Sequence, residues 1–316
     1  MSDLTPNSSP IVRPFSSEEP AVTVPVFQPP ITPGDQTLFF PNTEGTPPPD
    51  PPTRIPHLGH ALLFGVCTLL LLALSQLLLL AFYHTTPGRM ATTIPNKLLV
   101  ASEAFTYLVT LTISWFVFPV LWQRPFAEGI QFNPAAARRN AIRLIPLGIT
   151  LSFIVQALSS LITLPKSIPM DDFFRTPSDV WVVTAFGILL APLFEETLFR
   201  GFLFPAFAIA YDWLCLPRTE AAREQWNSTN HLTNGAYIFS AVLTSVFFAA
   251  LHGQQVAFAW PVLLLLFCVS LILTAVRYRL RSVLASTLVH ASYNLAIFIT
   301  AFIGTGGYRH LERMTR

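Results

Sequence analysis

The sequence predicts an all-α fold: a polytopic bundle of seven or eight transmembrane helices. Only 11% of the 316 residues are charged, whereas 52% are hydrophobic; soluble domains carry roughly a quarter charged residues. The mean hydropathy is +0.52. Apolar runs also recur at about the 20-residue length that crosses a bilayer as a helix. Together these observations indicate a protein that folds in lipid.

The N-terminal residues 1–56 differ from the rest of the chain. They hold fifteen of the 28 prolines, most densely at residues 47–52. Proline lacks an amide donor and fixes φ, so we expect a disordered, partly polyproline tail here. No basic region precedes a short apolar core in this tail, so we expect no cleaved signal peptide. The transmembrane domain is predicted to cover residues 57–316.

Seven apolar runs follow the tail, and the first is interpreted as an uncleaved signal anchor. Their predicted bounds are 61–83, 98–122, 143–164, 178–211, 236–252, 257–276 and 282–303. The fourth run is too long for one straight span and contains Pro192 and Pro205. We therefore expect it to kink or to divide into two helices.

Charge and cysteine content narrow the class further. Ten Arg and Lys residues flank the spans on the inner side and seven on the outer side if the N-terminus lies inside, a weak bias for that orientation. The net charge is +2 without a basic cluster, which argues against a nucleic-acid partner. Cys67, Cys215 and Cys268 have no CxxC spacing, so a disulfide framework or a thiolate metal site is not expected.

Two acidic residues lie inside the fourth apolar run. An ionised side chain at the bilayer centre costs about 2.5–3.5 kcal/mol on insertion scales, so Glu195 and Glu196 need a reason to be there. Glu196 and Arg200 are four residues apart, share a helix face and can pair. Glu195 is rotated about 100° from Glu196 and is therefore available for chemistry. The alternative is a purely structural ionic network.

Only two of the seven histidines fall within or at the end of an apolar run: His252 and His290. Phe248 lies one turn before His252 and can fix that imidazole by packing. Asn294 lies one turn after His290 on the same face. Either histidine alone is typical of a structural hydrogen-bonding group. Together with Glu195, they predict one shared polar pocket.

Such a pocket supports two kinds of hydrolysis. A carboxylate and an imidazole can activate water, while a second histidine and an asparagine stabilise the oxyanion, which predicts peptide-bond cleavage without a covalent intermediate. Alternatively, Glu195, His252 and His290 could bind zinc, with water as fourth ligand. Zinc is thus the one candidate cofactor, and these residues leave both mechanisms open. HExxH and GxSxG motifs are absent from the sequence, and Glu103 is interpreted as an interfacial residue.

Three motifs carry a family resemblance: Glu195-Glu196-xxx-Arg200, Phe248-xxx-His252 and His290-xxx-Asn294. In order and placement they resemble the motifs of the CPBP (Abi) family of type II CAAX prenyl endopeptidases and bacteriocin-processing enzymes. The resemblance covers about residues 180–300. It implies an intramembrane endopeptidase, with Glu196, Arg200 and Phe248 supporting the site.

The same resemblance implies that Glu195 and His252 activate water and that His290 and Asn294 form the oxyanion hole. The family has been described both as metalloproteases and as glutamate-dependent enzymes. The implied partners are membrane lipid and a protein or peptide substrate, with lipidated (prenylated CAAX) proteins among the candidates. Few glycosylation sequons lead us to expect a bacterial plasma membrane.

Two alternatives belong to other functional classes. A non-catalytic immunity or scaffold protein could keep the same fold, although the intact motifs argue against it. A transporter could use the polar cluster as an ion relay, which would predict acids on several helices or an inverted repeat, and the sequence has neither.

Overall fold

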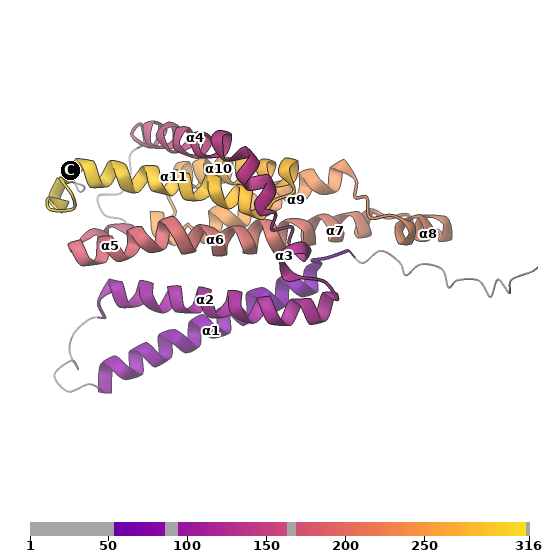
Figure 1. The fold of residues 1–316 in the computed structure, drawn as a ribbon, viewed down its shortest axis with the longest axis horizontal. Helices are drawn as coiled ribbons and strands as arrows, with labels where there is room; N and C mark the ends of the chain where they lie inside the picture. The colour runs from indigo at the N-terminus through magenta and orange to yellow at the C-terminus, as the bar shows by residue number, and fades with distance from the viewer. Residues whose placement is uncertain (1–53, 86–93, 163–168, 314–316) are drawn as a thin grey trace, which may run out of the picture. The chain divides into compact units, whose positions relative to one another are not determined.

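The computed structural model describes residues 54–85, 94–162 and 169–313, and every regular element within these ranges is a helix (Figure 1). The predicted all-α class is therefore confirmed. The proline-rich tail lies outside the described residues apart from its last three positions, so its predicted disorder stays a prediction.

Seven helical runs in the described ranges are long and apolar enough to cross a membrane. This number lies within the predicted range of seven or eight transmembrane helices. The runs are α1 (Leu58–Thr85), α2 (Asn96–Trp122), α4 (Pro134–Ser159), the composite run Pro177–Cys215, α9 (Asn234–Leu251), α10 (Trp260–Leu280) and α11 (Val283–Gly304). Short elements join them: α3 (Phe126–Gly129), η1 (Pro169–Phe174), α8 (Glu220–Ser228), η4 (Gln254–Val256) and η5 (Leu311–Arg313).

The third span begins earlier than predicted, at Pro134 instead of residue 143. The Asn133 side chain accepts a hydrogen bond from the Ala136 amide, and proline occupies the first helical turn. Both are favourable N-terminal signals. The apolar run starts later than the helix because the first two turns carry Arg138, Arg139 and other polar residues. The hydropathy pattern therefore identified the apolar part of this helix but not its N-terminal turns or its N-cap residue, Asn133.

The composite run is one continuous helix built from five segments. These are α5 (Pro177–Ala185), the π-helical η2 (Phe186–Leu190), α6 (Ala191–Glu196), the π-helical η3 (Thr197–Leu203) and α7 (Phe204–Cys215). Pro192 and Pro205 stand in the first turns of α6 and α7, each directly after a π-helical segment. The wider turns accommodate the missing proline amide, so the run does not divide into two spans.

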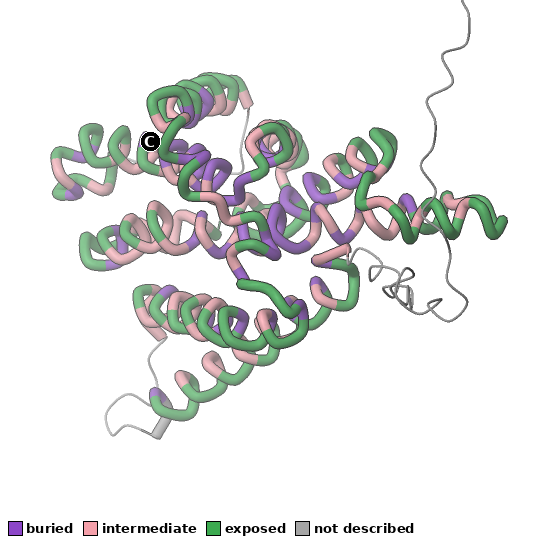
Figure 2. Tube along the Cα trace, turned by 45° about the vertical axis from the view of Figure 1, so that its right-hand side comes forward, coloured by how far each residue is buried: buried purple, intermediate pink, exposed green. Residues whose placement is uncertain are grey.

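Large apolar side chains cover the outside of the bundle. Leu69, Leu70, Phe116 and Val120 are examples, and each is about two-thirds exposed. Such a surface suits lipid and would aggregate in water. Figure 2 shows that the buried residues gather where the inner helices meet. The chain is an integral membrane protein.

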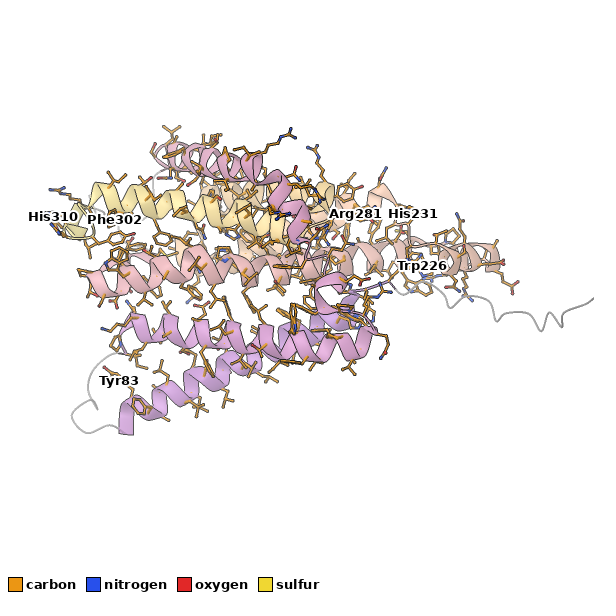
Figure 3. The ribbon with its side chains drawn as sticks, in the orientation of Figure 1. Tyr83, Trp226, His231, Arg281, Phe302 and His310 are labelled. Atoms are coloured by element: carbon orange, nitrogen blue, oxygen red, sulfur yellow. The ribbon has the colours of Figure 1, made fainter. Side chains whose placement is uncertain are left out.

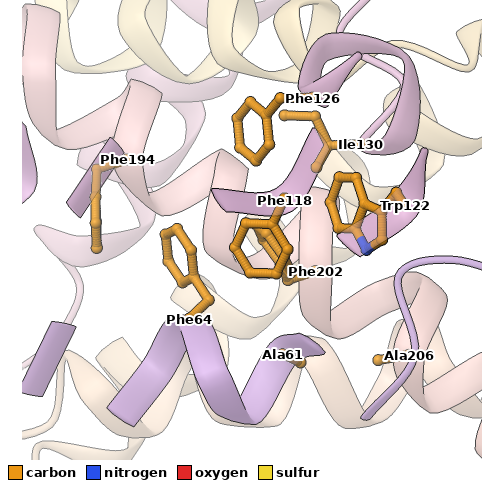
Figure 4. Packing of buried hydrophobic residues seen from close by; sticks show 9 residues of the cluster. All are labelled: Ala61, Phe64, Phe118, Trp122, Phe126, Ile130, Phe194, Phe202 and Ala206. Carbon is orange, nitrogen blue, oxygen red and sulfur yellow. The ribbon is translucent and has the colours of Figure 1, made fainter. Parts of the chain in front are cut away.

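Two apolar clusters hold the helices in place. The first joins α1, α2 and α3 to the composite run through ring contacts among Phe64, Phe118, Trp122, Phe126 and Phe202 (Figure 4). The second joins α4, α10 and α11. Helix α11 packs along α4, and a Cβ at Gly148 of α4 would lie 2.3 Å from the backbone oxygen of Val289. This close approach fixes α11, which carries two of the predicted site residues.

Candidate active site

The predicted site residues come from three separate helices. Glu195 and Glu196 end α6, between the two π-helical segments. His252 is the C-cap residue of α9. His290 lies within α11, and the α6 and α11 segments contact each other. The fold thus brings together side chains that are far apart in the sequence.

Glu196 and Arg200 form the predicted ion pair, with 2.8 Å between Glu196 Oε1 and Arg200 Nη1. Both side chains are 0% exposed. Arg200 also donates to the backbone oxygen and hydroxyl of Ser270 at 2.9 and 2.7 Å, and to Thr274 at 3.4 Å. A buried ion pair is stable only when further hydrogen bonds satisfy its groups. Helix α10 supplies them here.

His290 is held by the same carboxylate. Its Nδ1 lies 3.0 Å from Glu196 Oε1. An ionised carboxylate only accepts hydrogen bonds, so Nδ1 carries the hydrogen and donates it. In the neutral imidazole, Nε2 then bears the lone pair, and it lies 3.9 Å from Glu195 Oε2. Glu196 therefore sets both the tautomer and the orientation of His290.

His252 is oriented in a parallel way. Its Nδ1 donates to the backbone oxygen of Phe248 at 2.7 Å, because a carbonyl oxygen can only accept. Its Nε2 lies 3.8 Å from Glu195 Oε2. The Phe248 ring packs against both imidazoles, with centroid distances of 4.5 Å to His252 and 5.9 Å to His290. Packing by Phe248 matches the sequence prediction.

Glu195 differs from its neighbour in its exposure and in its ion pairing. Its side chain is 20% exposed, against 0% for Glu196. Its Oε2 atom is buried and accepts no hydrogen bond from any residue that the structure describes. The same oxygen faces the Nε2 atoms of both histidines. Glu196 is fixed through Oε1 by Arg200 and His290, although its Oε2 is also buried without a hydrogen-bond partner among the described residues. Glu195 has no such anchor and is available.

Asn294 lies one turn after His290, as its spacing predicts. Its amide nitrogen donates to the backbone oxygen of Gly187 at 2.7 Å. Gly187 belongs to η2, where the π-helical pattern changes the usual backbone pairing. Asn294 thereby ties α11 to the composite run. Within the described part of the chain, its side chain makes no hydrogen bond to Glu195, His252 or His290.

Helix α2 adds two residues that the sequence analysis did not assign to the site. Tyr107 donates its hydroxyl to Glu103 at 2.8 Å, and its ring stacks on Phe194 at 3.7 Å. Phe194 directly precedes Glu195, so this stack places Tyr107 beside the site. Glu103 is half-buried on α2, and its interfacial position stays a prediction. Its spacing of four from Tyr107 in an apolar helix was the available signal.

The predicted zinc set does not match this geometry. Tetrahedral zinc with N and O ligands at about 2.0–2.2 Å places the ligand atoms about 3.4 Å apart. Glu195 Oε2 is instead 3.8 and 3.9 Å from the two Nε2 atoms. Across the described part of the chain, no group of three or more His, Cys, Asp and Glu residues is arranged to hold a metal ion. The placement of Glu195, His252 and His290 therefore gives zinc no support.

A family model described as type II CAAX prenyl endopeptidase Rce1-like matches residues 177–296. Over these residues the chain is similar to that family. The match runs from α5 through most of α11 and contains all seven motif residues, which confirms the predicted resemblance. The Rce1-like segment excludes α1, α2 and α4, so Glu103 and Tyr107 lie outside it. No curated protein and no solved structure matches the chain.

The Rce1-like match indicates CAAX-type intramembrane protease activity, in agreement with the predicted class. Seven apolar helices place that segment in a membrane. The predicted bacterial plasma membrane stays a prediction, because neither the family nor the fold specifies an organism.

Proposed function

We propose that this protein is an intramembrane endopeptidase in which Glu195 and His252 activate a water molecule to cleave a peptide bond. One observation carries the proposal. Glu195 Oε2 is buried, accepts no hydrogen bond from the described residues, and faces His252 Nε2 and His290 Nε2 at 3.8 and 3.9 Å. A structural network would hold this carboxylate by an arginine, as Arg200 holds Glu196 through Oε1.

The separations suit a bridging water. They are too long for direct hydrogen bonds, and a water at about 2.8 Å from each atom spans them with acceptable geometry. The water donates one hydrogen to Glu195 Oε2 and the other to His252 Nε2, whose lone pair faces it. Its oxygen lone pair is then directed away from both groups, toward a substrate carbonyl.

The reaction follows from these positions. Glu195 removes a proton as the water oxygen bonds to the scissile carbonyl carbon, and the carbonyl electrons move onto its oxygen. The tetrahedral species collapses when the C–N bond breaks. Glu195 returns the proton to the departing amine nitrogen. No covalent enzyme intermediate forms, and the carboxylate is regenerated.

The oxyanion needs donors, and we assign these to His290 and Asn294. His290 Nδ1 already donates to Glu196, so donation from Nε2 requires the imidazolium form. Asn294 uses one amide hydrogen for Gly187 and retains a second. Preorganised donors of this kind contribute about 2.7–4 kcal/mol each to the rate.

The substrate class follows from the family and the site's depth. The Rce1-like match favours a prenylated CAAX peptide, whose lipid would anchor it beside a membrane-embedded site. Membrane lipid and a lipidated protein or peptide are therefore the proposed partners. A non-catalytic scaffold would have no use for a buried carboxylate that faces two imidazoles.

The test is cleavage of an internally quenched, farnesylated CAAX peptide by the purified protein in nanodiscs. We expect cleavage by the wild type and at least about a hundredfold loss in Glu195→Gln and His252→Gln. Glu224→Gln is the matched control, since Glu224 is an exposed residue of α8. Equal cleavage by the wild type and Glu195→Gln would overturn the mechanism.

A further inference from the structure

Five arginines surround one cavity at the end of the bundle opposite His310. The cavity measures about 650 Å³, and its arginines, here called the arginine pocket, are Arg54, Arg124, Arg277, Arg279 and Arg281. Figure 3 shows Arg281 at this end, with Phe302 and His310 at the other. Glu128 is the one acidic residue in the lining. Positive charge is therefore concentrated here.

Arg277 is the deepest of the five, at 5% exposed. Its Nη1 donates to the Gln131 side chain at 2.9 Å, and its Nη2 to the Ile130 backbone oxygen at 3.4 Å. Its Nε has no hydrogen-bond partner among the described residues. Its hydrogen-bond partners there are neutral, and Arg281 adds a like charge nearby. A buried guanidinium without a counter-charge is costly, so this arrangement calls for an anion.

The position of the pocket indicates the source of that anion. Most of its lining comes from the segments where spans begin or end on one side, around the start of α1, the end of α2, the start of α9 and the end of α10, and α7 supplies the rest. This is the level of the bilayer boundary, where lipid phosphates lie. The general excess of positive charge in the inner loops of membrane proteins does not require any of these arginines to be buried. Arg138 and Arg143 supply such charge in exposed positions on α4.

A second, apolar cavity adjoins the arginine pocket. It measures about 520 Å³, is lined by residues that include Leu58, Trp213 and Trp226, and shares Arg54 and Ile209 with the first cavity. Arg54 donates to the Trp226 backbone oxygen at 2.7 Å and lies 3.6 Å above the indole ring. A cationic cavity beside an apolar one matches an amphiphile, with tryptophans at the usual interfacial level.

We propose that the arginine pocket binds the phosphate of an anionic lipid headgroup, and that the adjoining apolar cavity receives the first part of its acyl chain. Arg277 is the central phosphate contact, because its Nε and its charge are both uncommitted among the described groups. Arg279 and Arg281 contribute from the exposed rim. The lipid would join α10 to the segments around α1 and α3. This site is independent of the proteolytic proposal.

The experiment measures lipid retention by native mass spectrometry of the full chain, with phosphatidylglycerol and phosphatidylcholine as probes. We expect the wild type to retain phosphatidylglycerol preferentially. Arg277→Gln should bind it at least about tenfold more weakly, as expected for a lost charge-assisted contact. Arg138→Gln, which makes the same charge change outside the pocket, should bind it as the wild type does.

A rim variant keeps the test decisive if Arg277→Gln fails to fold. Arg279→Gln combined with Arg281→Gln alters exposed residues only, and we expect it to lose the preference for phosphatidylglycerol. Equal retention of both lipids by the wild type overturns the proposal, as does equal weakening in Arg138→Gln. Inorganic phosphate that displaces the lipid completely at millimolar concentration also overturns it, because the site would then be one for soluble phosphate.

Discussion

Glu196 binds His290 and Arg200 through a single oxygen: Oε1 accepts from His290 Nδ1 at 3.0 Å and from Arg200 Nη1 at 2.8 Å. The carboxylate therefore links an ion pair within the composite helix to a site imidazole on α11. Residues that hydrogen-bond to the groups of a reactive site commonly orient those groups in this way. Their substitution is therefore expected to lower both stability and activity. The two adjacent glutamates accordingly have different predicted phenotypes.

Glu195→Gln should lower activity without lowering stability. The substitution keeps the side-chain shape and removes a carboxylate whose Oε2 accepts no hydrogen bond from the described residues. We expect kcat to fall by about 10²–10⁴, the usual contribution of a general base, with the unfolding midpoint unchanged or raised. Peptide cleavage and thermal unfolding in the same detergent measure the two effects. A fall in the midpoint of several degrees would contradict the assignment of Glu195 as the available acid.

Glu196→Gln should show the opposite balance. It leaves the fully buried Arg200 without its counter-charge, which costs about 3–5 kcal/mol. Denaturant unfolding measures that loss. Arg200→Gln is the companion variant, and the double variant should lose less than the sum of the two single ones because the pair fails together. Strict additivity would show that the 2.8 Å contact is energetically unimportant.

Tyr107→Phe should destabilise the protein by about 1.5–3 kcal/mol, the range for a hydrogen bond to a charged group. It removes the donor to Glu103 and retains the ring that stacks on Phe194. Because Phe194 precedes Glu195, we also expect reduced peptide cleavage. Tyr278→Phe, at an exposed tyrosine, is the control and should match the wild type. Identical unfolding of both variants would remove Glu103 and Tyr107 from the site's support.

Chelators should leave the cleavage rate unchanged. The 3.8 and 3.9 Å separations at Glu195 Oε2 are wider than zinc ligation sets. The check is activity after dialysis against 1,10-phenanthroline, together with elemental analysis of the purified protein. Loss of activity that stoichiometric zinc restores would reinstate Glu195, His252 and His290 as metal ligands.

The sequence predicted those features that depend on local periodicity. The lengths of the apolar runs predicted seven or eight spans. The four-residue separation of Glu196 and Arg200 predicted that they form an ion pair. Features that depend on contacts between helices were out of reach. Nothing local indicates that Ser270 completes the Arg200 network, or that Tyr107 of α2 stacks on Phe194 beside Glu195. The π-helical segments could not be predicted either. Pro192 and Pro205 indicate an interruption of the α-helix but do not specify whether it is a kink, a break or a π-helical turn.

Gly148 provides the strictest test of how the fold positions the site. A Cβ at this position would lie 2.3 Å from the Val289 backbone oxygen and 2.8 Å from the Ser292 Cβ. Gly148→Ala should therefore push α11 away from α4 and displace His290, the residue after Val289. Overpacking costs about 1–3 kcal/mol, and a shift near 1 Å can lower activity about a hundredfold.

The matched control is Gly65→Ala on α1, where an added Cβ meets nothing within 4 Å. Both substitutions raise helix propensity in a membrane span by the same amount, so only packing distinguishes them. We expect Gly65→Ala to unfold and cleave as the wild type does. If Gly148→Ala behaved identically, the close contact of α4 with α11 would not be what positions His290, and the orientation of that imidazole would rest on Glu196 alone.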